Sequence, residues 1–204
     1  MTTLTFGNNK HYNPVSLRPE MKEYTVFVDG ISKSLAATGV RVGWSMGPKK
    51  VMERMKSIIG HMGAWAPKAE QVAVAKFLRN TEAYDAFQIE IHKKLTDRLT
   101  AFHNAFQQLK KDGFAVNSMA PQGAIYLTVQ FSLNGKKKSD GAVLKSTREI
   151  TSYILNEAKV AIVPFYAFGT SENSDWYRLS VGTAKTEEIP AVMNAIKQAL
   201  EKLS

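Results

Sequence analysis

The chain has 204 residues, of which 44% are hydrophobic and 22% are charged, an ordinary globular balance that excludes general disorder and allows a buried core. It contains no cysteine, which excludes disulfides and thiolate metal sites, and no apolar run in it is long enough to span a bilayer. The net charge of +9 is compatible with an anionic ligand or a nucleic acid, but the one dense basic run, residues 136–138, has no interleaved aromatic residues, so we interpret it as a solvated loop.

The first 80 residues begin with a loop-like stretch and continue as strands and helices. Residues 24–28 (YTVFV) are continuously apolar, which predicts a buried strand, and a second strand is expected at 40–46. Helices are expected after Gly47-Pro48 and over residues 67–78. Because YTVFV is apolar on both faces, it needs sheet neighbours on both sides, for which the chain shows no clear source. We therefore interpret residues 1–80 as the incomplete end of a larger sheet domain.

A long helix is predicted next, because residues 82–111 contain neither Gly nor Pro and carry one apolar stripe. At a rise of about 1.5 Å per residue, this helix would be roughly 45 Å long. A compact pattern of strands and helices follows, in which Thr186 is the expected N-cap of the last helix. The predicted strands are 114–117, 124–131, 160–163 and 176–181, and the predicted helices are 141–158 and 186–203. The fold class is thus α/β, with the remainder of a large domain joined by the long helix to a small carboxyl-terminal domain within residues 81–204.

Lys33 has unusual surroundings for a lysine, because its segment, GISKSLAATGVRVGW, is rich in small residues. Small neighbours let a bulky group lie against the backbone, and the serine hydroxyls can bind phosphate oxygens. Arg41 adds a guanidinium fork that suits a phosphate. A second cation near a partly buried lysine favours the neutral amine, which can attack an aldehyde. From these residues alone, a cofactor-binding lysine and an exposed turn lysine both stay open.

Four ordered segments of the chain resemble the class I/II aminotransferases, fold-type I enzymes that use pyridoxal 5'-phosphate (PLP), and in particular the aspartate aminotransferases. The pattern SK-x-x-x-x-x-G-x-R-x-G around Lys33 is similar to the lysine-site signature of that family. The other segments are PQGAIYL at 121–127, VAIVPFYAFG at 160–169 and YRLSVGTAKTEEI at 177–189. Each segment is weak alone, but the ordered set covers most of the chain and is specific.

The resemblance implies roles for individual residues. Lys33 would form the Schiff base with PLP and later move a proton, while Arg41 would bind the cofactor phosphate with Ser32 as a further contact. Arg178 would grip the α-carboxylate of the substrate in a two-pronged salt bridge. The implied function is transamination between an amino acid and a 2-oxo acid, in a cytoplasmic homodimer without a metal, nucleic-acid or membrane partner.

The sequence also departs from the family. Members are about twice as long, and the resemblance places this chain in their carboxyl-terminal half, without the phosphate cup, the ring-stacking aromatic residue and the aspartate that keeps the pyridine nitrogen protonated. Phe165 and Tyr166 stand where smaller residues are common, which predicts a narrowed or aromatic substrate pocket. Residues 61–68 contain no arginine that would favour a dicarboxylate substrate, and Trp65 there either lines the pocket or packs at an interface.

Three alternatives to an aminotransferase are kept. The chain could be a catalytically inactive fragment or an assembly module of such an enzyme. It could belong to a related PLP lyase, because elimination and decarboxylation use the same lysine and arginine. A basic nucleic-acid binder is the third, and a steep salt dependence of affinity would identify it.

Overall fold

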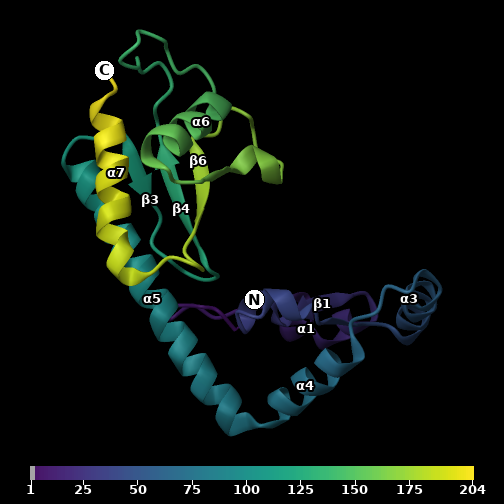
Figure 1. Cartoon of the computed structure of the whole chain (residues 1–204). Coiled ribbons are helices and arrows are strands. Elements are labelled where there is room, and N and C mark those ends of the chain that lie inside the picture. The colour runs from purple at the N-terminus through teal and green to yellow at the C-terminus, as the bar shows by residue number, and fades with distance from the viewer. Residues whose placement is uncertain (1–2) are drawn as a thin grey trace. The chain divides into compact units, whose positions relative to one another are not determined.

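The computed structural model describes residues 3–204, and the chain divides into two compact units, Met1–His92 and Lys93–Ser204. The division falls within helix α5 (Thr81–Lys111), which runs without a break from the first unit into the second (Figure 1). The sequence explains this continuity, since it offers neither Gly nor Pro to interrupt the helix between residues 82 and 111. The prediction of one long helix is confirmed.

The first unit combines a β-hairpin with several helices. Its elements are α1 (Pro14–Leu17), β1 (Phe27–Gly30), α2 (Ile31–Ser34), β2 (Gly43–Met46), α3 (Lys49–Met62) and α4 (Lys68–Arg79), with 3-10 turns η1 (Pro19–Glu23) and η2 (Thr38–Val40). The two strands pair antiparallel, with Gly30 opposite Gly43. Helices α3 and α4 begin directly after Pro48 and Pro67, as predicted, because proline suits a helix start, where a backbone N–H has no partner.

The strand predicted at residues 24–28 differs from the prediction in position and in burial. Strand β1 begins at Phe27, and among the described residues β2 is its only sheet partner. The side chains of Tyr24 and Val28 are 82% and 71% exposed. The prediction of a buried strand is therefore wrong for this chain, because a strand that is apolar on both faces becomes buried only when further strands or helices cover it.

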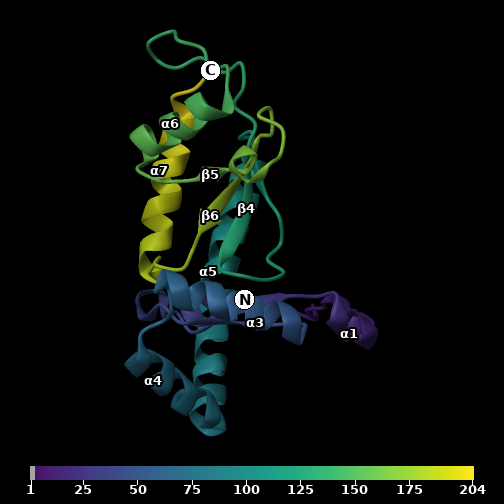
Figure 2. The ribbon, with the colours of Figure 1, turned by 90° about the vertical axis from the view of Figure 1, so that its right-hand side faces the viewer.

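The second unit contains a four-stranded antiparallel sheet in the order β3-β4-β6-β5. Its strands are β3 (Val116–Ser118), β4 (Tyr126–Phe131), β5 (Val163–Pro164) and β6 (Trp176–Ser180), its helices besides α5 are α6 (Thr147–Ala158) and α7 (Ile189–Glu201), and its 3-10 turns are η3 (Phe165–Phe168) and η4 (Thr186–Glu188). Figure 2 shows α6 and α7 together beside the sheet, and Tyr153 of α6 donates a hydrogen bond to the Ala199 carbonyl of α7 at 2.6 Å. Helix α5 joins this core through Phe106, whose ring meets that of Phe131 edge-on, with 5.7 Å between centroids.

The core of the second unit lies on one face of the sheet. Leu127 and Val129 of β4 stand opposite Leu179 and Tyr177 of β6, and all four side chains are buried. Because side chains alternate along a strand, the residues between them point to the other face. Arg178 lies between Tyr177 and Leu179, so it belongs to the less buried face of the sheet.

Thr186 is not the N-cap of the last helix, contrary to the prediction. Residues Thr186–Glu188 already form the 3-10 turn η4, and Glu188, itself in a helical conformation, precedes α7 without a side-chain cap. An N-cap residue has an extended backbone that lets its hydroxyl accept from the first turn, and a residue within a helical turn lacks that geometry. The α/β fold class itself is confirmed.

Two properties of the described chain bear on its partners. Between residues 3 and 204 no helix combines the length and the apolar character that crossing a membrane requires. Within the same residues, no group of three or more histidine, aspartate or glutamate side chains is arranged to hold a metal ion.

Candidate active site

Lys33 lies on α2, a single helical turn that follows β1 directly. Ile31 anchors this turn, because its side chain is buried and its N–H donates to the Val42 carbonyl at 3.3 Å. The close pairing of β1 and β2 beside this turn favours glycine, since a Cβ at Gly30 would lie 3.0 Å from the Val42 carbonyl oxygen and a Cβ at Gly43 would lie 3.0 Å from the Asp29 carbonyl oxygen. The lysine thus projects from a short turn that is fixed to both strands of the hairpin.

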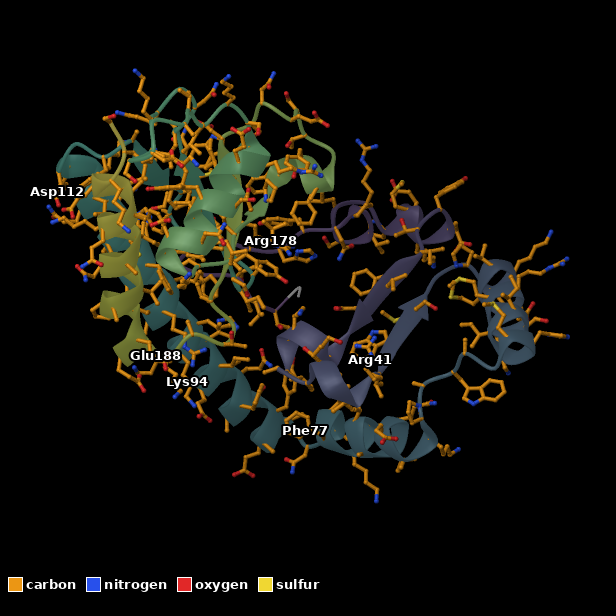
Figure 3. The ribbon with its side chains drawn as sticks, turned by 45° about the horizontal axis from the view of Figure 1, so that its top comes forward. Arg41, Phe77, Lys94, Asp112, Arg178 and Glu188 are labelled. Carbon is orange, nitrogen blue, oxygen red and sulfur yellow. The ribbon has the colours of Figure 1, made fainter. Side chains whose placement is uncertain are left out.

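Thr38 connects the backbone around Lys33 to Arg41. The Thr38 hydroxyl donates to the Ser32 carbonyl at 3.0 Å, and the Thr38 carbonyl accepts from Nη1 of Arg41 at 3.1 Å. Sequence inspection did not single out Thr38, because its role depends on the fold of the loop. Figure 3 labels Arg41 next to the hairpin. Ser32, Lys33 and Arg41, the three residues assigned to the cofactor, therefore share one local hydrogen-bonded loop of the first unit.

This loop contains two residues in a backbone region that favours glycine. Ala36 has a φ of 49° and Arg41 has a φ of 60°. Left-handed conformations of this kind are uncommon for residues with a Cβ, and they persist only where the surrounding contacts enforce them. Such local strain is frequent at ligand-binding segments, which agrees with the assignment of this loop to a site.

The loop presents donors without acidic partners. Among residues 3–204, neither Lys33 nor Arg41 makes an ion pair with a carboxylate. Arg41 uses one N–H on the Thr38 carbonyl, which leaves its other donors available to an anion. The segment thus carries an amine, a hydroxyl and a guanidinium within ten residues of sequence, none of them paired with a carboxylate of the described chain.

Arg178, labelled in Figure 3, lies on the less buried face of β6 in the second unit, and its guanidinium contacts two aromatic rings. Its guanidinium carbon is 4.3 Å from the ring centroid of Tyr126 and 4.5 Å from that of Phe168. The N–H groups of a guanidinium lie in its own plane, so one that contacts aromatic rings can still offer two parallel hydrogen bonds to a carboxylate. No acidic side chain of the described chain forms an ion pair with it.

Three of the four motif segments meet at this arginine. Tyr126 comes from PQGAIYL, Phe168 from VAIVPFYAFG and Arg178 from the segment that starts with YRLSVG. Gly169 has a φ of 92° and ends the turn that carries Phe168, a conformation that glycine adopts without strain. The arginine was predicted from the sequence, whereas the two rings were not. The aromatic position in each of the other two motifs was the available signal.

The other residues predicted near the substrate lie as follows. Phe165 and Tyr166 are in η3, where the Phe165 ring contacts Phe168 edge-on with 6.2 Å between centroids. Phe165 therefore supports a ring that stacks on the arginine, and its effect on pocket width stays a prediction. Trp65, in the first unit, is 63% exposed and lines a surface hollow with Met55 and Ile59, and its place at a substrate pocket or an interface stays a prediction.

Known proteins resemble the chain over its whole length. The sequence pattern of the family "Aminotransferase class I and II" matches residues 3–196. An aspartate aminotransferase from Geobacillus stearothermophilus is 30% identical over 201 residues, which are 98% of this chain and 45% of that protein. A probable aspartate/prephenate aminotransferase from Rickettsia typhi is 28% identical, over 98% of this chain and 48% of that protein.

Solved structures agree with these relatives. The aspartate aminotransferase from Rhizobium meliloti superposes with a TM-score of 0.84 at 25% identity, over 99% of this chain and 48% of that one. An aromatic aminotransferase from Pyrococcus horikoshii OT3 has a TM-score of 0.78 at 26% identity, over 98% and 49% of the two chains. The chain thus spans about half the length of the relatives it matches. Because the family pattern includes all four motif segments, the chain belongs to the aminotransferase class I and II family, whose members depend on pyridoxal phosphate.

Proposed function

We propose that this chain supplies Lys33 as the amine that binds PLP covalently and Arg178 as the group that binds the substrate carboxylate, in an enzyme that transfers an amino group from an amino acid to a 2-oxo acid. One observation carries the proposal. The family match covers Lys33, Arg41 and Arg178, and none of these three cations has an acidic partner among the described residues. Cations without an acidic partner suit a reaction whose ligands are phosphates and carboxylates.

The donors of the lysine loop fit the cofactor. A primary amine can bond to an aldehyde, and the guanidinium of Arg41 with the hydroxyl of Ser32 can bind a phosphate dianion. When bound, PLP supplies an electron-withdrawing ring that stabilises negative charge on the substrate's α-carbon. Lys33 would hold the cofactor and transfer the proton during the reaction. Thr38, which contacts both Ser32 and Arg41, would hold these two residues close to each other.

The setting of Arg178 supports carboxylate binding. Arginine is the residue suited to planar, two-pronged recognition of a carboxylate, and the contacts with two rings would restrict its motion before the ligand arrives. One matched structure is a Thermus thermophilus aspartate aminotransferase with maleate, itself a carboxylate ligand. For this chain we propose amino acids and 2-oxo acids as the substrate class, with the aromatic cluster around Phe168 next to the bound carboxylate.

The exposure of the first unit favours a second candidate function, in which this chain is one part of an enzyme and becomes active only after it assembles with further polypeptide. Few side chains of the first unit are buried: helices α3 and α4 contain none. Among the described residues, the buried hydrophobic side chains of this unit are Leu4, Phe6, Ile31 and Val42. We propose that residues 1–80 are the carboxyl-terminal part of a larger cofactor-binding domain and that residues 81–204 are the connecting helix and the small domain. Further polypeptide and a second copy of the chain would then complete the enzyme.

Cofactor binding tests the proposed function. The chain is titrated with PLP and, separately, with pyridoxal, which has the aldehyde but no phosphate, and binding is followed by absorbance. We expect a preference for PLP that is lost in Lys33→Ala and reduced in Arg41→Met, whereas Lys49→Ala, at an exposed lysine of the same unit, leaves binding unchanged. Equal binding of PLP by the Lys33→Ala variant and the unaltered chain would reject Lys33 as the cofactor residue.

A further inference from the structure

The one-turn helix α2 depends on groups outside the helix to satisfy its backbone carbonyls. A helix of this length closes few internal hydrogen bonds, so most of its carbonyl groups need other partners. The carbonyls concerned are those of the four helical residues and that of Gly30, which directly precedes them. Four of these five carbonyls have partners close in sequence. Gly30 accepts from Oγ of Ser34 at 3.3 Å, Ile31 from the N–H of Leu35 at 3.1 Å, Ser32 from Oγ1 of Thr38 at 3.0 Å and Lys33 from the N–H of Ala36 at 3.3 Å.

The fifth carbonyl, that of Ser34, has a distant partner. It accepts from Nε2 of Gln88 at 3.3 Å, across 54 positions of sequence. Among the described residues, Gln88 is the one side chain from outside the loop that donates to this run of carbonyls. The carbonyl next to Lys33 in sequence is therefore tied to helix α5, and not only to its own loop.

Aromatic side chains pack against helix α5 on both sides of Gln88. The ring of Phe77 on α4, labelled in Figure 3, meets Tyr84 and Phe87 edge-on, with 6.2 Å between centroids in each case. One turn beyond Gln88, the His92 ring contacts Phe6 with 5.8 Å between centroids. Aromatic contacts thus hold the helix on both sides of Gln88, and aromatic pairs of this geometry add to the free energy of packing.

We infer that Gln88 is a positioning residue for Lys33. By holding the end of α2 it fixes the direction in which the lysine amine leaves the backbone, and an amine must meet its electrophile within a narrow range of geometry. Gln88 acts through the Ser34 carbonyl and does not touch the reacting atoms. The chemical consequence of this positioning rests on the function proposed for Lys33, whereas the tethering of α2 does not.

The chemistry of Gln88 allows positioning to be separated from general stability. Its Oε1 is buried and has no hydrogen-bond partner among the described residues. Leucine at this position removes the donor to Ser34 but also removes an unsatisfied buried acceptor, so the two effects on unfolding oppose each other. Gln88→Leu should therefore release α2 without unfolding the unit. Gln88→Glu keeps the shape and replaces the donor with an acceptor.

Amide hydrogen exchange and cofactor capture on the whole chain test this inference together. In Gln88→Leu and Gln88→Glu, we expect the amides of Leu35 and Ala36 to exchange about threefold to tenfold faster, the range that the loss of one hydrogen bond produces. Second-unit amides should not change, and borohydride-fixed PLP at Lys33 should fall. The matched control is Gln108→Leu on the same helix, where the amide donates to Asp112 at 2.7 Å.

The possible results distinguish this inference from the proposed function. Unchanged exchange at Leu35 and Ala36 in both variants overturns the tethering by Gln88, even if Lys33 captures PLP. Faster exchange with unchanged capture overturns the positioning of Lys33. If the unaltered chain captures no PLP at Lys33 but exchange still accelerates in both variants, the tether stands and the cofactor role of Lys33 fails.

Discussion

Replacing Tyr177 with phenylalanine tests how the strand that carries Arg178 is held in the core. Tyr177 is fully buried and meets Phe131 edge-on with 5.7 Å between ring centroids. Its hydroxyl makes no hydrogen bond of good geometry among the described residues. The nearby Thr147 hydroxyl partly offsets the rise that burial causes in the pKa of Tyr177, but it donates to the carbonyls of Glu172 at 2.7 Å and Ser174 at 3.2 Å. Removing an unsatisfied buried hydroxyl should leave the variant at least as stable as the unaltered protein near neutral pH.

Above neutral pH the two proteins should diverge. Burial, and then the negative charge of Asp175, raises the pKa of Tyr177 above its ordinary value of 10.0. A raised pKa in the folded state means that the contribution of the neutral hydroxyl to stability is complete below pH 10 and is lost as the pH rises further. The loss is about 1 kcal/mol between pH 10 and pH 11 and then approaches about 1.4 kcal/mol for each further pH unit until the folded group itself ionises. Tyr177→Phe has no such group and escapes this loss.

Urea unfolding at pH 8, 10 and 11 measures the difference. The stability gap in favour of Tyr177→Phe should grow by about 1 kcal/mol between pH 10 and pH 11, because half of the unfolded tyrosine is already ionised at pH 10. Phe106→Leu, a core change without a titrating group, should keep the same gap to the unaltered protein at all three values. A gap between Tyr177→Phe and the unaltered protein that does not change with pH would refute the assignment of Tyr177 as a buried neutral group.

Three further substitutions have defined outcomes. Phe168→Leu removes one ring from Arg178, so the binding of a 2-oxo acid, titrated by calorimetry, should weaken about twofold to fivefold, as expected for a cation–π contact worth about 0.5–1 kcal/mol; unchanged affinity would show that the ring does not orient the guanidinium. Gly30→Ala places a Cβ 3.0 Å from a carbonyl oxygen and should lower the stability of the hairpin by about 1–3 kcal/mol. The control is Gly39→Ala, where the new Cβ has no atom within 4 Å, and amide hydrogen exchange in β1 and β2 should be faster only in Gly30→Ala. Leu99→Ala, at a fully buried position of α5, should lower the free energy of unfolding of the second unit by about 2–5 kcal/mol in urea titrations, and a loss below 1 kcal/mol would contradict the packing described.

The sequence predicted those helices and strands whose apolar side chains pack against other residues of the same chain. The apolar stripe of α5 predicted a helix, and the second half of that stripe, Leu95, Leu99, Phe102, Phe106 and Leu109, is buried in the core. The strands predicted at residues 124–131 and 176–181 are present as β4 and β6, and the second of them carries Arg178 as predicted. Periodicity succeeds here because each side chain meets partners that the same chain provides.

The remaining features depend on contacts that a local pattern does not contain. Tyr24 and Val28 are apolar but exposed, because burial requires a covering layer and β2 is the only strand that the described chain pairs with β1. Thr186 has the right chemistry for an N-cap, yet a 3-10 turn displaces it. The role of Gln88 was invisible in the sequence, since it arises from a contact across 54 positions.

Mapping the lysine that PLP modifies would decide the assignment of the cofactor residue. The chain is incubated with less than one equivalent of PLP, reduced with borohydride and digested, and the modified peptides are quantified by mass spectrometry. Attachment should concentrate on the peptide that contains Lys33, and free phosphate in the mixture should suppress it by competing for Arg41. Modification spread evenly over exposed lysines such as Lys49 and Lys93, with no excess at Lys33, would contradict the assignment.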